Sequence, residues 1–321
     1  MTTASDVASP VDFAAYGDYK VKAPKRPDGS FVRPVYRFAD RVTADGSSGY
    51  LAEPGRYHLY ISLACPWAHR SAIVRGLLGL QDALSMSVVD PLRDGRGWAF
   101  RDGPGFTADP VNGFILLRDA YEATEPGYDG HVSVPVLWDT QTGRIVSNNF
   151  PDITIDLETQ FGQWAKPGMD LYPAALRPAI DALNEQVYAT VNNGVYRCGF
   201  ATSQQAYEEA VAALFGTLDQ LEQRLATRRY LFGDSITEAD VRLWVTLARF
   251  DAVYVTHFKA NLRRLVDYPN LWAYARDLYQ QPPFRETTNF DHIKRHYYMT
   301  HPNINPTRMV PAGPLLDWDT P

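Results

Sequence analysis

Residues 57–68 read Tyr-His-Leu-Tyr-Ile-Ser-Leu-Ala-Cys-Pro-Trp-Ala, and these twelve residues indicate how the first half of the chain folds. Apolar side chains recur at every second position over 57–62, which is the spacing of a β-strand. A helix is predicted over 68–78, entered through a proline that suits a first helical turn. A second strand is predicted over 84–89, and the order strand–helix–strand predicts a parallel βαβ unit with a right-handed crossover.

The segments on either side complete an α/β domain. Residues 90–130 contain seven glycines and are predicted to form loops that wall a cleft. Next, residues 134–138 and 144–146 flank a short polar turn, which predicts a β-hairpin. A βαβ unit followed by a hairpin is the order of the thioredoxin-like fold, so we expect such a domain over 56–165. Residues 1–55, rich in Pro, Gly, Asp and Ser, are predicted to form an extended arm.

Beyond about residue 170 the pattern predicts helices alone. Apolar residues recur at spacings of three and four over 180–191 and 207–225. The segment 239–254 is apolar on nearly every side, which predicts a central buried helix, and another helix is expected over 271–280. We therefore expect an all-helical domain over 170–300.

The central helix and the end of the chain carry further signals. Thr237 and Asp240 have the spacing of a capping box and predict where the central helix begins. The last twenty residues contain five prolines, so a proline-rich extended tail is predicted over 301–321.

Composition excludes several classes of protein. At roughly 150 residues per domain, 321 residues predict about two domains. The formal charge of −6 argues against a nucleic-acid partner. No apolar run approaches the roughly 18–20 residues that span a bilayer, and the first 15 residues do not resemble a signal peptide. Two cysteines rule out a disulfide framework, so we expect a cytoplasmic protein with no membrane partner.

Metal binding is poorly supported. His292 and His296 have helical i, i+4 spacing, but no Glu follows as in metalloproteases and no cysteine pair is near. We expect a surface or packing role for this pair and no metal site.

Cys65 is the most informative residue, because it follows a strand and begins a helix. Unpaired backbone N–H groups and the positive end of the helix dipole favour an anion there, so a thiolate is expected to have a lowered pKa. The alternative is a small buried cysteine at a strand end. Pro66 and Val134-Pro135 favour the nucleophile, because the thioredoxin-like fold places a cis-proline opposite its reactive cysteine.

The neighbours of Cys65 indicate how it would be regenerated. Ala68 stands where dithiol enzymes have their second cysteine, so dithiol chemistry is not expected. Cys198 belongs to the helical half and is interpreted as a packing residue. A single reactive cysteine must then be released from a mixed disulfide by a small thiol from solution.

With these residues assembled, the chain resembles the glutathionyl-hydroquinone reductases, the Xi class of glutathione transferases. The resemblance covers about 56–314 and implies a helical glutathione-transferase domain at the C-terminal side. It rests on the motifs at 65–68, 97–100, 134–139, 193–196, 249–254, 257–259, 267–271 and 292–298.

The family implies a reductase in which Cys65 attacks the sulfur of an S-conjugated hydroquinone. Tyr196 matches the proton donor of the family, and Tyr254 and Tyr297 match tyrosines that stabilise the thiolate, since a phenol that donates to an anion favours its charged form. Aromatic packing is the alternative role for each tyrosine. The family also implies a low-molecular-weight thiol as co-substrate, no bound cofactor, and a homodimer assembled through the helical domain.

The expected thiol site departs from the family. His131 stands at an arginine position, and Asn149-Phe150 stands at a Glu-Ser pair that holds the γ-glutamyl group of glutathione. Each lost hydrogen bond to a charged group costs about 1.5–3 kcal/mol, so affinity for glutathione is expected to fall about a hundredfold. The residues expected to hold the thiol are Trp98, His131, Val134, Pro135, Asn149 and Phe150.

Two hypotheses follow for the thiol. Mycothiol, whose sugar-like body lacks a γ-glutamyl group, suits Asn149 together with stacking on Phe150 or Trp98. Alternatively, the thiol is glutathione, with Asp152 substituting for the missing Glu or the loop binding through its backbone.

Two other functions compete with hydroquinone release. An omega-like glutathione-dependent disulfide or dehydroascorbate reductase needs Cys65 but not the tyrosines at 196, 254 and 297. A non-catalytic transferase-like binding module is favoured by the altered thiol loop but opposed by the retained cysteine and tyrosines.

Overall fold

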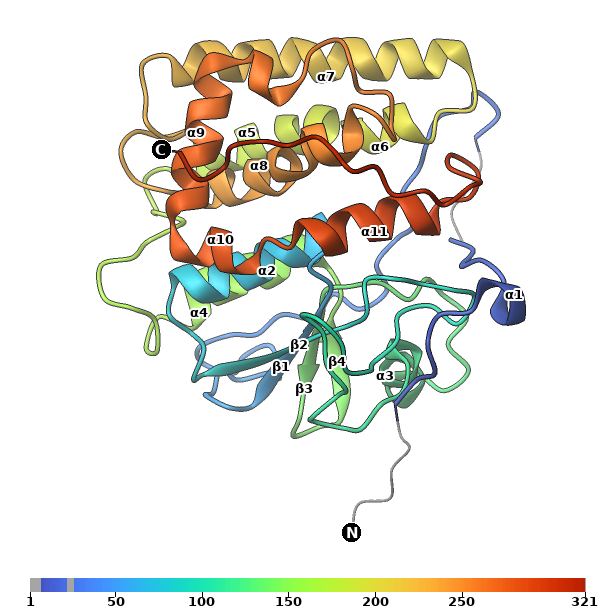
Figure 1. The fold of residues 1–321 in the computed structure, drawn as a ribbon. Coiled ribbons are helices and arrows are strands. Elements are labelled where there is room, and N and C mark those ends of the chain that lie inside the picture. The colour runs from blue at the N-terminus through green and yellow to red at the C-terminus, as the bar shows by residue number, and fades with distance from the viewer. Residues whose placement is uncertain (1–6, 22–25, 321) are drawn as a thin grey trace. The chain divides into compact units, whose positions relative to one another are not determined.

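The computed structural model describes residues 7–21 and 26–320, and these form two units, each described by itself (Figure 1). Residues 1–6 and 22–25 of the predicted arm and the final Pro321 lie outside the described residues. The units interleave along the sequence. Unit 1 contains the described residues of 7–21, 35–169 and 291–300, and unit 2 those of 26–34, 170–290 and 301–320.

A four-stranded mixed sheet forms the centre of unit 1. Its strand order is β2-β1-β3-β4, with β1 parallel to β2 and antiparallel to β3. Helix α2 (Pro66–Leu77) connects the two parallel strands, and the antiparallel pair β3–β4 is the predicted hairpin. The thioredoxin-like order is thus confirmed. The strands are β1 (Tyr57–Ile61), β2 (Leu84–Val88), β3 (Val136–Asp139) and β4 (Arg144–Ser147).

Strand β1 is buried along its whole length, although the alternation of apolar and polar residues in its sequence is typical of a half-buried strand. Its polar residue His58 is accommodated because two serines of β2 bond both ring nitrogens: Ser85 Oγ lies 2.7 Å from Nδ1 and Ser87 Oγ lies 2.8 Å from Nε2. Burial lowers the pKa of His58 to about 4, so the imidazole is neutral at pH 7.

Helix α3 (Leu117–Thr124) lies in the segment that was predicted to be rich in loops, where no helix was expected. Its buried residues Leu117, Ala120, Tyr121 and Thr124 have helical spacing, and the Asp119 carboxylate accepts backbone N–H groups where the helix begins. The glycine-rich surroundings concealed this short helix. The other helices of unit 1 are α1 (Phe13–Tyr16), α4 (Phe150–Gln160) and all but the first residue of α11 (Phe290–Thr300).

Unit 2 is helical, and two of its predicted helices end in π-helical turns. The helix predicted over 180–191 runs as α5 into η1, and the one predicted over 239–254 runs as α8 into η2. Such turns are rare and frequently mark functional sites. The elements are α5 (Arg177–Val187), η1 (Tyr188–Asn192), α6 (Gly194–Gly199), α7 (Gln204–Leu225), α8 (Glu238–Arg249), η2 (Phe250–Tyr254), η3 (Leu265–Asp267), α9 (Pro269–Gln280) and α10 (Pro282–Thr287).

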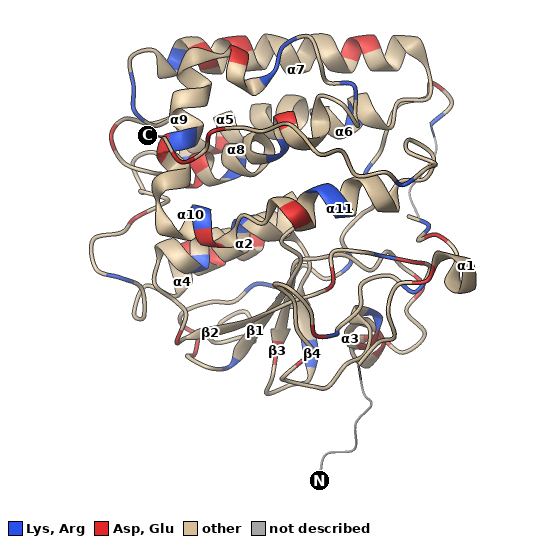
Figure 2. Ribbon diagram, viewed as in Figure 1, with Lys and Arg blue, Asp and Glu red and all other residues tan. Residues whose placement is uncertain are grey.

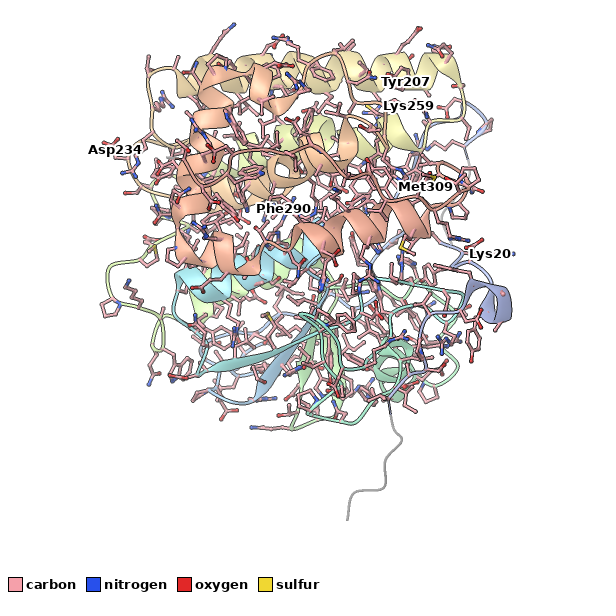
Figure 3. The ribbon with its side chains drawn as sticks, viewed as in Figure 1. Lys20, Tyr207, Asp234, Lys259, Phe290 and Met309 are labelled. Atoms are coloured by element: carbon pink, nitrogen blue, oxygen red, sulfur yellow. The ribbon has the colours of Figure 1, made fainter. Side chains whose placement is uncertain are left out.

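Helix α8 is the buried centre of unit 2, as predicted. The Asp240 carboxylate accepts hydrogen bonds from the backbone N–H and the hydroxyl of Thr237, which confirms the capping box. Near the other end of the unit, the Tyr207 hydroxyl of α7 donates to the carbonyl of Lys259 at 2.7 Å (Figure 3).

Acidic and basic residues are interspersed along the chain rather than gathered by sign (Figure 2). Within the described ranges, no helix is both long enough and apolar enough to cross a membrane.

Candidate active site

Cys65 is the N-cap residue of α2, with Pro66 in the first turn. The Cys65 N–H donates to the Ser62 carbonyl at 3.1 Å, and the Cys65 carbonyl accepts the N–H of His69 at 3.0 Å. The side chain is half-buried and makes no capping bond to the helix. The sulfur is therefore attached at the positive end of a helix, where a thiolate is favoured.

The cis peptide bond expected between Val134 and Pro135 is present beside this sulfur. Cys65 Sγ lies 3.7 Å from the Val134 carbonyl oxygen and donates to it. Register explains the meeting: β3 begins just after Pro135 and pairs antiparallel with β1, with Val136 opposite Tyr60. The residues that precede β3 and those that follow β1 therefore lie at the same end of the sheet.

Trp98 is almost fully buried in unit 1, between a cation and an imidazole. The Arg93 guanidinium carbon lies 4.6 Å from its ring centroid, and the His296 ring stacks on it at 5.1 Å with 17° between planes. Arg93 also lies 4.3 Å from the ring of Tyr19, whose hydroxyl is 3.1 Å from His131 Nδ1. Sequence reasoning missed Tyr19 and Arg93, because neither belongs to a periodic segment.

Tyr297 lies on α11 and is 1% exposed, with its ring edge-on to His296 at 5.5 Å. The two histidines predicted to pack fix this helix to the loop that carries Trp98. His296 Nδ1 donates to the Pro91 carbonyl at 2.6 Å, and His292 Nε2 donates to the Pro104 carbonyl at 2.7 Å. Over the described part of the chain, no group of three or more His, Cys, Asp or Glu could hold a metal ion.

Phe150 does not have the role that the mycothiol hypothesis gave it. Its ring is 2% exposed, lies 4.6 Å from the Trp67 ring and is covered by the Arg70 guanidinium at 5.0 Å, so it cannot stack on a ligand. Asn149 is half-buried at the N-cap of α4, and its amide donates to an Asp152 carboxylate oxygen at 2.7 Å. The Asp152 carboxylate therefore lies beside Asn149 at the start of α4.

The other two expected catalytic tyrosines lie in unit 2. Tyr196 of α6 and Tyr254 of η2 have ring centroids 6.1 Å apart, and both rings pack against Phe258. Tyr254 is fully buried and Tyr196 is 9% exposed. Cys198 lies on the same short helix as Tyr196 and is buried as predicted; this burial raises its pKa to about 12, so its thiol stays protonated at pH 7.

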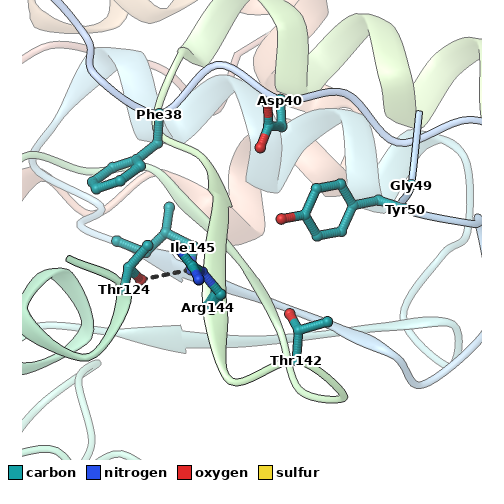
Figure 4. A pocket seen from close by; sticks show the side chains of 8 residues that line it. All are labelled: Phe38, Asp40, Gly49, Tyr50, Thr124, Thr142, Arg144 and Ile145. Atoms are coloured by element: carbon teal, nitrogen blue, oxygen red, sulfur yellow. Dashed lines mark hydrogen bonds between the residues drawn. The ribbon is translucent and has the colours of Figure 1, made fainter.

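A pocket of about 350 Å³ also opens in unit 1, with Phe38 and Tyr50 on its walls (Figure 4). It lies at the opposite end of the strands from Cys65. Arg144, which lines the pocket, pairs with Asp139, and Asp139 pairs with Tyr57 at the start of β1, whereas Cys65 follows the end of β1. None of the predicted site residues lines it. The lining residues are Phe38, Asp40, Gly49, Tyr50, Thr124, Thr142, Arg144 and Ile145.

Comparison with known proteins gives matches over nearly the whole chain. A family model described as glutathione S-transferase, C-terminal domain, matches residues 204–277. The chain is 50% identical to the glutathionyl-hydroquinone reductase YqjG of Escherichia coli, over 92% of this chain and 93% of that protein. It is 48% identical to the glutathionyl-hydroquinone reductase PcpF of Sphingobium chlorophenolicum, over 90% and 91%.

Solved structures agree. The chain superposes on glutathione-S-transferase Xi from Phanerochaete chrysosporium with a TM-score of 0.89 at 47% identity, covering 93% of this chain and 96% of that one. The TM-score is 0.85 at 50% identity for the glutathione-bound structure of YqjG from Escherichia coli, covering 92% and 96%.

Proposed function

Because the chain belongs to the glutathionyl-hydroquinone reductases, the Xi class of glutathione transferases, we propose that it is a thiol-dependent reductase that releases hydroquinones from their S-conjugates. The observation that carries the proposal is the half-buried Cys65 at the start of α2, with its sulfur 3.7 Å from the Val134 carbonyl. A Cys65 thiolate can attack the sulfur of a conjugate that binds beside Val134 at this end of the sheet.

The reaction has two displacements. The Cys65 thiolate attacks the conjugate sulfur, the new S–S bond forms, and the bond between sulfur and the ring carbon breaks. The electron pair stays on that carbon, which takes a proton from Tyr196 and becomes the C–H of the free hydroquinone. A second thiol, as thiolate, then attacks the mixed disulfide, releasing the Cys65 thiolate and a symmetric disulfide. The ring carbon is reduced, and the conjugate sulfur and the second thiol are oxidised to that disulfide. The proton that the second thiol loses restores the phenol of Tyr196.

Tyr254 and Tyr297 are assigned to the stabilisation of the thiolate. A phenol in a buried site donates a stronger hydrogen bond to an anion than it would in water, because little solvent competes. Both hydroxyl-bearing rings are at most 1% exposed, which supports this role.

We further propose that the thiol is glutathione, with mycothiol as the alternative. The Asp152 carboxylate, held by Asn149, supplies the charge that the missing Glu would give to the γ-glutamyl ammonium. Arg93, near both Trp98 and His131, supplies a cation for a carboxylate of the thiol, which mycothiol lacks. Phe150 and Trp98 are both buried, which removes the stacking that favoured mycothiol, and one structural relative is a glutathione-bound protein.

Paired substrates test the identity of the thiol. We expect the glutathionyl conjugate of a hydroquinone to be reduced at a higher kcat/KM than the mycothiyl conjugate of the same ring. Asp152→Asn should raise KM for the glutathionyl conjugate about tenfold, the effect of one lost charged hydrogen bond, and leave the mycothiyl conjugate unchanged. Faster turnover of the mycothiyl conjugate would reverse the assignment.

Substitution of Tyr196 separates the hydroquinone reaction from omega-like chemistry. Tyr196→Phe should lower kcat for a glutathionyl-hydroquinone about a hundredfold, because the proton donor is lost. Reduction of a glutathione mixed disulfide by the same variant should change little, since no carbon is protonated there. Tyr207→Phe, which removes a hydroxyl bonded only to a loop carbonyl in the described contacts, is the matched control. Little change on either substrate would favour the disulfide reductase.

The remaining proposals concern the surroundings of the enzyme. We propose a homodimer assembled through the helical unit, as in the family that the chain resembles. A cytoplasmic location is proposed because a reactive thiol such as Cys65 requires a reducing compartment.

A further inference from the structure

A guanidinium covers the ring of Tyr196. The guanidinium carbon of Arg33 lies 4.7 Å from the centroid of that ring. Its Nε and Nη2 donate to the side-chain oxygen of Asn193 at 3.2 and 3.1 Å, so the planar group is held in one orientation. Phe31 packs beside it, with its ring centroid 6.3 Å from that of Tyr196.

The segment that carries Arg33 is anchored separately on unit 2. The Thr202 N–H donates to the Gly29 carbonyl at 3.0 Å, and the Ser203 hydroxyl donates to the Asp28 carbonyl at 2.8 Å. Gly29 has a φ of +80°, and a Cβ there would lie 2.9 Å from the Ser203 nitrogen, so this contact requires glycine. These bonds hold residues 28–29 against the start of α7, so the backbone near Arg33 is fixed relative to Tyr196.

We propose that Arg33 is a positioning residue for the proton transfer from Tyr196, an inference that rests on the proposed function. When Tyr196 gives its proton to the ring carbon it becomes a phenolate, and that charge forms beside a guanidinium that is always protonated. A cation over an aromatic face is attracted to the neutral phenol and more strongly to the phenolate. Arg33 therefore makes Tyr196 a stronger acid and holds its ring.

Several other groups also lie around Tyr196. Phe200 and Phe258 are uncharged. Tyr254 is a neutral phenol at neutral pH. The His301 ring contacts the rings of Phe200 and Phe258, and its Nδ1 lies 3.1 Å from His257 Nε2. Burial lowers the pKa of His257 to about 4, so His257 is uncharged at pH 7.

The test compares three variants on a glutathionyl-hydroquinone. Arg33→Met should lower kcat at pH 7 about tenfold, in line with the loss of a desolvated cation–π contact. It should also move the alkaline limb of the kcat profile to higher pH, since a weaker acid stays protonated longer. Arg33→Lys keeps the charge and should recover part of both effects. Arg37→Met is the control, because Arg37 similarly covers the ring of Tyr128 in unit 1 and should leave both unchanged.

A measurement without turnover separates this inference from the reductase proposal. Ultraviolet difference spectra between each protein and its Tyr196→Phe derivative report the titration of the Tyr196 phenol. We expect a lower pKa with arginine or lysine at position 33 than with methionine. If Arg33→Met does not fold, Asn193→Ala replaces it in the test. This variant removes the hydrogen-bond acceptor that holds the Arg33 guanidinium and should also raise the pKa of Tyr196. An unchanged Tyr196 pKa in the folded variants would overturn the inference, whatever the enzyme reduces.

Discussion

At the scale of single residues, the two cysteines show how position decides reactivity. Cys65 is half-buried at the first turn of α2, where the helix dipole favours a thiolate. Cys198 lies inside α6, and burial raises its pKa to about 12. The same side chain is therefore expected to be a nucleophile in one place and inert in the other.

Alkylation tests this contrast directly. With iodoacetamide at pH 7, mass spectrometry should find the adduct on Cys65 and none on Cys198 in the folded protein. The rate at Cys65 should rise with pH through a midpoint below about 8.5, the ordinary pKa of a thiol. A midpoint at or above that value would favour the binding module over the enzyme.

At the scale of elements, strand β1 links a buried histidine to acid stability. An unfolded histidine has a pKa near 6.5, whereas burial lowers that of His58 to about 4. Between these two values the unfolded state binds the extra proton and the folded state does not. Stability is therefore lost as pH falls from about 6.5 toward 4, and His58 contributes no pH dependence above that window.

Urea unfolding at a series of pH values checks this sign. The free energy of unfolding should fall between pH 7 and pH 5, and His58→Gln should make the fall shallower because one of the titrating groups is gone. His257→Gln should do the same from unit 2, where burial lowers the histidine pKa to about 4 as well. A steeper dependence in His58→Gln would contradict the assignment.

At the scale of the whole molecule, the two units do not follow two continuous stretches of sequence. Residues 26–34 of the expected arm belong to unit 2, and residues 291–300 of the expected helical domain belong to unit 1. These exchanged segments carry Arg33 and Tyr297, so each brings a residue that we propose to be functional into the unit that the linear order would not assign to it.

Light scattering after size-exclusion chromatography tests the proposed homodimer. A dimer should give a mass of about 72 kDa, twice the 36.1 kDa of one chain. The mass should persist on dilution through the concentrations at which activity is measured. A mass of about 36 kDa with full activity would show that the second copy is not needed for the reaction.

Much of the frame could be predicted from local patterns. The strand and helix segments of the βαβ unit, the hairpin, the capping box of α8 and the position of Cys65 depend on neighbours within a few residues, which the sequence displays. Helix α3 escaped because its four buried positions are surrounded by glycine-rich segments. The π-helical ends of α5 and α8 also escaped, since their apolar spacing resembles that of an α-helix.

Local sequence patterns were enough to predict the four strands and the helices α2, α5, α7, α8 and α9, and they placed a cysteine where a strand gives way to a helix. Only the tertiary structure decided that Phe150 is buried, that Arg93 covers Trp98 and that Arg33 lies over Tyr196. The difference lies in the sequence separation of the residues that interact. Periodicity and caps arise from interactions along one element, whereas burial and ring contacts depend on which distant segments pack together.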